Sequence, residues 1–253
     1  MIHLVIPARL NSLRLPNKML LARTGKPLVV HTVEAALRCR QAQRVTVVSE
    51  DLEIVEAVRA AFPQGRVIAA HEGPAASGTE RIANHHANTM GGDNDLIINL
   101  QGDEPEFPGE VLDELVAAAM RDRDCAVITL ATPATPNEMT DYNVAKVVCD
   151  HNGKAMYFSR SPIPTVGEGL RHLGVYLYRG YFLRQLPALR PTAYPGERLE
   201  QLQWLEAGCG IRVVTRAVDC TSIDTLEQYV AFTQRYLGTS QGESDVSVQR
   251  AEV

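Results

Sequence analysis

The sequence lacks a long apolar run, a basic excess and paired cysteines, and each absence excludes a class of protein. No apolar stretch reaches the roughly 20 residues of a membrane-spanning helix, and the charged, proline-bearing start does not resemble a signal peptide. A formal net charge of −5 argues against a general nucleic-acid-binding protein, which carries a basic face. The five cysteines are scattered without a CxxC pair, which is typical of a reduced protein without disulfides or structural zinc. We therefore expect a cytoplasmic protein with no membrane or nucleic-acid partner.

Two common nucleotide-binding motifs are also absent. The tripeptide Thr24-Gly-Lys26 resembles the end of a P-loop, but Leu20 stands where that motif needs its first glycine. Pro27 stands where the motif needs serine or threonine. No GxGxxG follows the first apolar segment. The sequence thus argues against a P-loop NTPase and a dinucleotide dehydrogenase, and an anionic ligand has to be bound by a local cluster of cations.

Short β-branched segments alternate along the chain with segments of helical spacing. The 253 residues, 45% of them apolar and 22% charged, suffice for one sizeable domain with a buried core. The patterns predict strands at 2–6, 45–49, 66–69, 95–100, 125–131 and 144–150, and helices at 27–40, 52–62, 77–90, 108–120, 197–206 and 226–236. This alternation is typical of an α/β protein, so we expect a Rossmann-like, mixed but mainly parallel sheet with helices on both faces.

The first twenty residues carry three cations on a segment that leaves its strand. Proline removes a backbone donor and fixes φ, so Pro7 and Pro16 turn the chain after the apolar strand into a loop. This loop carries Arg9, Arg14 and Lys18. Loops at the carboxyl ends of strands in open α/β sheets bind nucleotide-type ligands, and three positive charges suit a triphosphate. These residues alone leave open an ordinary surface loop with solvated cations.

A second polar segment, Asn99-Leu-Gln-Gly-Asp-Glu-Pro105, ends an apolar strand. Asp103 and Glu104 follow the strand directly, and Gly102 lets the backbone approach a neighbour closely. If this segment faces the cationic loop, it predicts a magnesium site, because Mg²⁺ takes oxygen ligands from one or two carboxylates and from substrate phosphates. A polar turn that merely closes a strand would have the same composition.

The neighbours His85 and His86 are a weaker candidate for a metal site. Adjacent residues on a helix point about 100° apart, so the two imidazoles do not share a face. We therefore expect both side chains to face solvent.

Seven segments resemble the 3-deoxy-manno-octulosonate cytidylyltransferases, or CMP-Kdo synthetases. They are Ile6-Pro-Ala-Arg9 with Arg14-Leu-Pro-Asn-Lys18, Ser77-Gly-Thr-Glu-Arg81, Asn99 to Pro105, Ala145-Lys-Val-Val148 with Tyr157-Phe-Ser-Arg-Ser-Pro-Ile-Pro164, Arg171-His-Leu-Gly-Val-Tyr-Leu-Tyr-Arg179, Leu199-Glu-Gln-Leu202 with Trp204-Leu-Glu206, and Ile223-Asp-Thr225. Each segment is a weak signal by itself. Seven of them in the family's order, from residue 2 to about residue 235, are a highly specific one.

The resemblance implies a fold, a reaction and an assembly. The fold is that of nucleotide-diphospho-sugar transferases, with a small lobe for sugar binding and dimerisation. The reaction joins CTP to 3-deoxy-D-manno-octulosonate (Kdo) or a close 2-keto-3-deoxy sugar acid, with Mg²⁺ as cofactor. The products are a CMP-sugar and pyrophosphate, for lipopolysaccharide or related glycan synthesis. The assembly is a homodimer.

The same resemblance implies roles for individual residues. Arg9, Lys18 and Asp103 would be catalytic, and the nucleotide would contact Pro7, Ala8, Arg9, Ser12, Lys18, Ser77, Gly78, Gln101 and Asp103. The sugar would contact Arg14, Gln101, Arg160, His172, Tyr176, Glu200 and Gln201. Asp103 and Asp224 would hold the Mg²⁺. Without the resemblance, Asp224 is better explained as a helix cap. Tyr176 alternates along an apolar strand, and a core residue explains it as well as a sugar contact does.

The resemblance also divides the chain. We expect a single domain over residues 1–237, with a nucleotide-binding half at about 1–131 and a sugar-binding and dimerisation part at about 132–222. The polar tail, residues 238–253, has little apolar content and is expected to be disordered. Two alternatives remain open: a cytidylyltransferase for another acceptor, such as a modified ulosonate or a phosphonate, and a non-catalytic nucleotide-sensing protein of the same fold.

Overall fold

The computed structural model describes the backbone of residues 1–249 and the side chains of residues 1–238. The strands are β1 (Ile2–Pro7), β2 (Arg44–Ser49), β3 (Val67–His71), β4 (Leu96–Asn99), β5 (Val127–Pro133), β6 (Lys146–Cys149), β7 (Ala155–Ser159), β8 (Leu170–Arg179) and β9 (Ile211–Thr215). The helices are α1 (Leu28–Ala36), α2 (Leu52–Ala61), α3 (Gly78–Asn88), α4 (Gly109–Arg121), α5 (Pro136–Thr140), α6 (Gly180–Gln185), α7 (Glu200–Glu206) and α8 (Leu226–Gln249). Short 3₁₀ turns cover Lys18–Leu20, Leu186–Ala188 and Pro195–Glu197. Among these residues, no helix combines the length and the apolar character that crossing a bilayer requires.

One mixed sheet joins the strands in the order β3-β2-β1-β4-β8-β5-β9. The pairs β3–β2, β2–β1, β1–β4 and β5–β9 are parallel, and β8 runs antiparallel to both β4 and β5. The β6–β7 hairpin attaches to β8 through β6. The predicted Rossmann-like architecture is confirmed, and the antiparallel β8 makes the sheet mixed.

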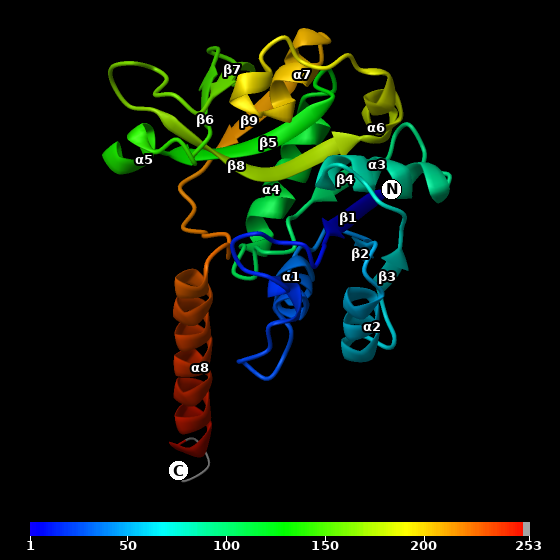
Figure 1. Cartoon of the computed structure of the whole chain (residues 1–253), viewed down its shortest axis with the longest axis vertical. Coiled ribbons are helices and arrows are strands. Elements are labelled where there is room, and N and C mark those ends of the chain that lie inside the picture. Colours follow the sequence, from blue (N-terminus) through cyan, green and yellow to red (C-terminus); the bar gives the residue numbers. More distant parts are fainter. Residues whose placement is uncertain (250–253) are drawn as a thin grey trace.

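Alternating side chains of the buried strands belong to two apolar clusters, one on each face of the sheet. On β1, Leu4 and Ile6 join the cluster under α1, α2 and α4, whereas Val5 joins the cluster under α3, α6 and α7. This period-two alternation in an apolar strand is what allows helices to cover both faces. Figure 1 shows α1 and α2 beside the amino-terminal strands, with α7, β6 and β7 at the opposite end of the molecule.

The last long connection returns the chain to the amino-terminal half. After β9, residues 216–225 run back across the molecule to α8, which extends away from the body (orange to red in Figure 1). The first turns of α8 are anchored, because Tyr229 and Phe232 are buried with Leu15 and Leu28 in a third apolar cluster. This return carries Asp224 to the edge of the sheet where β1 and β4 end.

Two predicted segments differ in the structure. The predicted helix 197–206 begins only at Glu200, because Arg198 has a positive φ of 52° that separates the 3₁₀ turn Pro195–Glu197 from α7. The helix predicted at 226–236 continues to Gln249 as α8, in a stretch that contains no proline to end it. The expected disorder of residues 238–253 stays a prediction. Residues 250–253 lie outside the described part of the chain.

Candidate functional site

A cavity of about 690 Å³ opens where β1 and β4 end. These strands are adjacent and parallel, so the loops that follow them leave the sheet at the same edge. The amino terminus of α3 forms another wall, and Ser77 caps this helix by accepting a hydrogen bond from the Glu80 backbone N–H at 3.1 Å. Strand ends of this kind, in an open α/β sheet, form crevices that bind ligands.

The structure brings the predicted nucleotide-binding residues together around this cavity. All nine line it, namely Pro7, Ala8, Arg9, Ser12, Lys18, Ser77, Gly78, Gln101 and Asp103. Arg14 and Asp224 line it as well. Their individual roles remain predictions, but their convergence from four segments of the chain is a property of the fold.

Two glycines permit the close approach of these segments at Pro7. A Cβ added to Gly102 would lie 3.2 Å from the Pro7 carbonyl oxygen, and one added to Gly78 would lie 3.1 Å from Pro7 Cγ. Both distances are tighter than ordinary van der Waals contact, so a larger side chain would push the walls apart. The two glycines therefore set the width of the cavity between β1, β4 and α3.

Lys18 joins the two carboxylates that were predicted to hold a metal. Its ammonium donates to Asp103 Oδ2 at 2.6 Å and to Asp224 Oδ1 at 2.9 Å. It also donates to the Ile223 carbonyl at 2.9 Å, while the Ile223 N–H donates to the Asp103 carbonyl at 2.9 Å. The segment that carries Asp224 is thus tied to the end of β4 by both side chains and backbone.

The electrostatics keep Lys18 charged. Burial by itself lowers the pKa of this amine, but the charges of Asp103 and Asp224 and their hydrogen bonds outweigh burial and raise its pKa. Arg14 forms a second ion pair with Asp224, 2.8 Å from Oδ2, and Arg9 is exposed on the same loop. At neutral pH the cavity wall therefore carries four cations, Arg9, Arg14, Lys18 and Arg81, against the carboxylates of Asp103 and Asp224. The net charge of the wall is positive, which suits a polyanion.

The carboxylates of Asp103 and Asp224 fit a divalent cation. Both lie within hydrogen-bonding distance of one point charge, the Lys18 ammonium, so they already face a shared cation. Hard carboxylate oxygens on one side and phosphate oxygens from a ligand are the donor set that Mg²⁺ prefers. These two residues would hold the ion, with the remaining ligands supplied by the substrate and by water.

Glu104, next to Asp103, is a buried carboxyl that bonds to the segment leading to Asp224. Burial raises its pKa to about 7, although a hydrogen bond from the Ser222 hydroxyl to Oε1, at 2.6 Å, opposes that shift. This bond adds one more link between the end of β4 and the segment that leads to Asp224. Of the two predicted carboxylates in Asn99 to Pro105, the cavity is therefore lined by Asp103 and not by Glu104.

Sequence reasoning assigned no role to Arg81, which lines the cavity although it is only 3% exposed. It pairs with Glu50, 2.8 Å from Oε1, and donates to the Gly73 carbonyl at 3.3 Å. The signal that could have found it is its place one turn after the Ser77 cap, which turns its side chain toward the same end of α3.

The predicted sugar-binding residues are divided between two places. Arg14 and Gln101 line the cavity, whereas Arg160, His172, Tyr176, Glu200 and Gln201 lie on β8, on α7 and directly after β7. Glu200 connects the two places, because its carboxylate accepts from Thr79 Oγ1 at 2.7 Å and also interacts with Ser77.

The Arg160 guanidinium is already engaged by backbone carbonyls. It donates to Glu197 at 3.3 Å, to Tyr142 at 3.3 Å and to Asn143 at 2.9 Å. Buried Lys146 also donates to the Arg160 carbonyl at 2.6 Å, which fixes the backbone there. Arg160 is therefore held in place, with part of its donor set already used.

His172, Tyr176 and Gln201 form a buried polar group. Burial lowers the pKa of His172 to about 3, so its imidazole is neutral at physiological pH, and it lies 2.8 Å from Thr129 Oγ1. Gln201 donates to the Tyr176 hydroxyl through a short hydrogen bond. Within the described chain, Gln201 Oε1 is buried and has no hydrogen-bond partner. Such an atom is costly to bury and is suited to accept a bond from a ligand hydroxyl.

The expectation that His85 and His86 face solvent is wrong. His86 is 7% exposed and packs against Gly91 and Gly180, where an added Cβ would lie 2.0 Å and 2.9 Å from its ring. His85 pairs with Glu72 at 2.6 Å. Helical spacing predicts which residues share a face of α3. It does not predict that a loop and the start of α6 cover that face.

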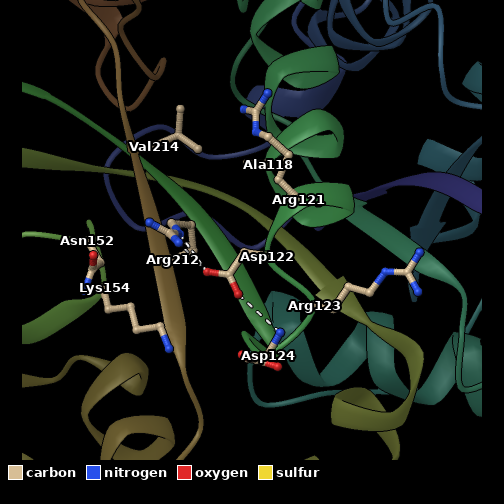
Figure 2. Close-up of a pocket in the computed structure, with 9 residues that line it drawn as sticks. All are labelled: Ala118, Arg121, Asp122, Arg123, Asp124, Asn152, Lys154, Arg212 and Val214. Atoms are coloured by element: carbon tan, nitrogen blue, oxygen red, sulfur yellow. Dashed lines mark hydrogen bonds and ion pairs between the residues drawn. The ribbon is translucent and has the colours of Figure 1, made fainter.

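A second cavity, of about 590 Å³, lies between the end of α4, β9 and the β6–β7 turn. Figure 2 shows that its central charges neutralise each other, with Arg212 bonded to Asp122 and Arg123 pointing away from that pair. Arg212 Nε and Nη2 lie 2.8 Å and 2.6 Å from Asp122 Oδ2, and Asp122 Oδ1 caps the Asp124 N–H at 3.2 Å. The ion pair between Arg212 and Asp122 holds the turn after α4 against β9. We assign the cavity no ligand.

Comparisons with known proteins identify the family of the chain. Residues 3–231 match the model of a family described as cytidylyltransferase. The 3-deoxy-manno-octulosonate cytidylyltransferase of Syntrophobacter fumaroxidans is 39% identical over 238 residues, 90% of this chain and 93% of that protein. The protein of the same name from Methylococcus capsulatus is 41% identical over 227 residues, 83% of this chain and 87% of its own.

A solved structure gives the same result. It is that of a CMP:2-keto-3-deoxy-manno-octonic acid synthetase complexed with CTP. It is 32% identical to this chain, superposes with a TM-score of 0.84, and the match covers 95% of this chain and 99% of the other. The family resemblance found in the seven sequence segments is confirmed.

Proposed function

Because the chain belongs to the cytidylyltransferase family, we propose that it transfers the cytidylyl group of CTP to Kdo. The products are CMP-Kdo and pyrophosphate, and the product serves lipopolysaccharide or related glycan synthesis. The proposal is supported by the names of the similar proteins, which cover most of this chain.

The observation that carries the proposal is the meeting of Lys18, Asp103 and Asp224 in one cavity. Each carboxylate lies within 3 Å of the ammonium, at 2.6 Å and 2.9 Å. Bringing three charged groups from distant segments out of water costs free energy, and a role in chemistry accounts for that cost. The cations suit the phosphates of the nucleotide, and the two convergent carboxylates suit the Mg²⁺ that the proposed transfer uses.

The reaction is an in-line displacement at the α-phosphorus of CTP. The anomeric hydroxyl oxygen of the acceptor forms the new bond to the α-phosphorus and loses its proton to solvent water. The bond between the α-phosphorus and the α,β-bridging oxygen breaks, and pyrophosphate leaves. In such transfers the protein mostly positions the reactants and neutralises developing charge. Arg9 and Lys18 supply positive charge on the triphosphate side, and the raised pKa of Lys18 keeps its amine protonated throughout the neutral range.

Mg²⁺ belongs to this proposal as cofactor, held by Asp103 and Asp224. When bound, it would neutralise phosphate charge and help to orient the α-phosphate. The contribution of the chain is to keep both carboxylates facing the same point, through the links of Lys18, Ile223 and Ser222 described above.

The acceptor side would use Arg160 for the sugar carboxylate and the polar group on β8 and α7 for the hydroxyls. Arginine suits a carboxylate because its donors form a planar fork. Gln201 Oε1, unpartnered in the described chain, and neutral His172 can both bond to hydroxyl groups.

We also propose that the protein is a cytoplasmic homodimer. All five cysteines are free thiols, in keeping with a reducing compartment. Tyr142, Met156 and Tyr194, on and beside the β6–β7 hairpin, are 62%, 63% and 53% exposed, and such side chains suit a protein interface. Sedimentation of the purified protein would test the assembly.

Release of pyrophosphate tests the proposed function. The protein is incubated with CTP, MgCl₂ and a panel of acceptors: Kdo, modified octulosonates, other 2-ulosonates and phosphonates. We expect release with Kdo at the highest kcat/KM. Faster release with another acceptor would assign that acceptor in place of Kdo. Saturable binding of CTP without release in any mixture would identify a nucleotide-sensing protein.

A further inference from the structure

A line of hydrogen-bonded side chains crosses the core beside the cavity. Gln101 Nε2 donates to Asn99 Oδ1 at 2.8 Å, and Asn99 Nδ2 donates to the Tyr178 hydroxyl at 3.2 Å. The Tyr178 hydroxyl lies 3.2 Å from Thr79 Oγ1, and Thr79 donates to Glu200 Oε1 at 2.7 Å. The five side chains come from the end of β4, from β8, from α3 and from α7.

The direction of this line follows from the number of protons on each hydroxyl. The single Thr79 proton is used on the carboxylate of Glu200, the shorter of its two contacts. The Tyr178 hydroxyl must therefore donate to Thr79, and it accepts from Asn99. Every donor from Gln101 onward points toward Glu200. A line that runs one way into a carboxylate is mutually polarised, so each bond strengthens the next.

The line lies in the core, where burying polar side chains costs more free energy than burying apolar ones. Asn99 and Tyr178 are 0% exposed, and Thr79 is 2% exposed. The Tyr178 ring stacks on Phe182 with centroids 5.8 Å apart and meets Trp204 edge-on at 5.9 Å. A phenylalanine would keep these ring contacts, so packing alone does not require the hydroxyl. What the hydroxyl adds is a fixed orientation for the polar groups on either side.

The two ends of the line lie on the two sides of the proposed reaction. Gln101 lines the cavity that is proposed to hold CTP. Glu200 begins α7, on the side proposed to hold the acceptor, and it also interacts with Ser77 in the cavity wall. Transfer between two bound substrates requires both to be held within a fraction of an ångström of the reacting geometry. A link between the residues that bind them would keep the two substrates in that geometry.

We propose that Tyr178 is a positioning residue for cytidylyl transfer. Through Asn99 and Thr79, its hydroxyl fixes Gln101 on the nucleotide side and Glu200 on the acceptor side relative to each other. This inference rests on the proposed function and adds to it a residue that is outside the cavity and contacts neither substrate.

Two conservative variants break the line at different bonds. Tyr178→Phe removes the central hydroxyl and keeps the ring, and Thr79→Val removes the donor to Glu200 at nearly constant volume. We expect each to lower kcat by about tenfold, the effect of one lost hydrogen bond in the transition state. The KM for CTP should stay within about twofold, because the phosphate-binding cations are untouched. The double variant should lose no more than either single variant, since one break disconnects the line.

Two control variants remove buried hydroxyls that lie outside the line. The Tyr229 hydroxyl accepts from the Arg23 N–H at 2.8 Å, and Thr233 donates to the Tyr229 carbonyl at 2.8 Å within α8. Tyr229→Phe and Thr233→Val should lower the unfolding temperature by a similar amount and leave kcat unchanged. Equal losses of kcat in these controls, or additive losses in the double variant, would overturn the positioning role.

A measurement without turnover separates this inference from the proposed function. The side-chain amide resonances of Asn99 and Gln101 are followed by NMR in the protein without ligands. We expect Thr79→Val to shift both, because the described hydrogen bonds join Thr79 to Gln101 through Tyr178 and Asn99, and Tyr229→Phe to shift neither. Unchanged Gln101 resonances would overturn the inference whatever the turnover. Shifted resonances in a protein that releases no pyrophosphate would refute the proposed function and keep the coupling.

Discussion

Asp103 and Asp224 share one cation, because both carboxylates accept a hydrogen bond from the Lys18 ammonium. In sequence, Lys18 is separated from them by 85 and 206 residues. The proposed metal site requires this convergence, and a structure with Asp224 elsewhere would have excluded it.

Neutralising either carboxylate should abolish most of the turnover. Asp103→Asn and Asp224→Asn keep the shape of the side chain and remove one ligand charge, so we expect kcat to fall by about 10²- to 10³-fold with the unfolding temperature nearly unchanged. The measurement is pyrophosphate release with CTP, Kdo and MgCl₂. Asp124→Asn, in the second cavity, is the matched control and should retain full activity. Normal turnover of Asp103→Asn would refute the assignment.

Removing Lys18 should destabilise the protein itself. Lys18→Met leaves two carboxylates facing each other without their shared cation. Breaking such a pair costs several kcal/mol when it is fully buried. Asp103 and Asp224 are 20% and 27% exposed, so solvent screens part of this effect and we expect about 2–3 kcal/mol.

Urea unfolding in EDTA measures this loss. Lys26→Met is the control, because the Lys26–Glu34 pair is about a third exposed and its removal should cost about 1 kcal/mol or less. Adding Asp103→Asn to Lys18→Met should recover part of the lost stability. Equal losses in Lys18→Met and Lys26→Met would show that the carboxylates do not depend on Lys18.

Arg160 should matter for the acceptor and not for CTP. We expect Arg160→Ala to raise the KM for Kdo by about tenfold or more and to leave the KM for CTP nearly unchanged. Arg160→Lys should not restore the acceptor KM, because a single ammonium cannot replace a planar fork that also holds the carbonyls of Glu197 and Asn143. Equal increases for both substrates would count against the carboxylate role.

His172 should make stability depend on pH below neutrality. Burial lowers its pKa from 6.5 to about 3 in the folded protein, so between these values the unfolded chain takes up a proton that the native imidazole does not. The stability that neutral His172 contributes is complete above pH 6.5 and is lost as pH falls.

We expect the unfolding free energy of the wild type, minus that of His172→Gln, to fall by up to about 1.4 kcal/mol per pH unit below 6.5. Urea unfolding at several pH values between 7.5 and 5.5 measures this difference. A difference that stays constant over this range would mean that the folded protein protonates the imidazole.

Local patterns in the sequence predicted those parts of the fold that depend on neighbouring residues. The helix predicted at 77–90 corresponds to α3, whose start depends on a local contact, because the Ser77 side chain accepts a bond from the first turn. The turn between β6 and β7 is also local, because Asn-Gly is a pair typical of hairpin turns and Gly153 has a φ of 75° that glycine tolerates.

The incorrect and incomplete predictions have a different origin. His86 is buried by Gly91 and Gly180, which come from a loop and from another helix. The start of α7 was misplaced because Arg198 adopts a positive φ that non-glycine residues rarely show, and no sequence pattern reported it.

By itself, the sequence determined the alternation of strands and helices, the cationic loop after the first strand and the carboxylates after the fourth, since each depends on spacing within a few residues. The meeting of Asp224 with Asp103 was implied by the family resemblance and not by local spacing. Only the tertiary structure decided that Lys18 bonds to both carboxylates and that a hydroxyl of β8 links Gln101 to Glu200. These contacts depend on the order in which distant strands lie in the sheet. The spacing of residues along the chain does not predict that order.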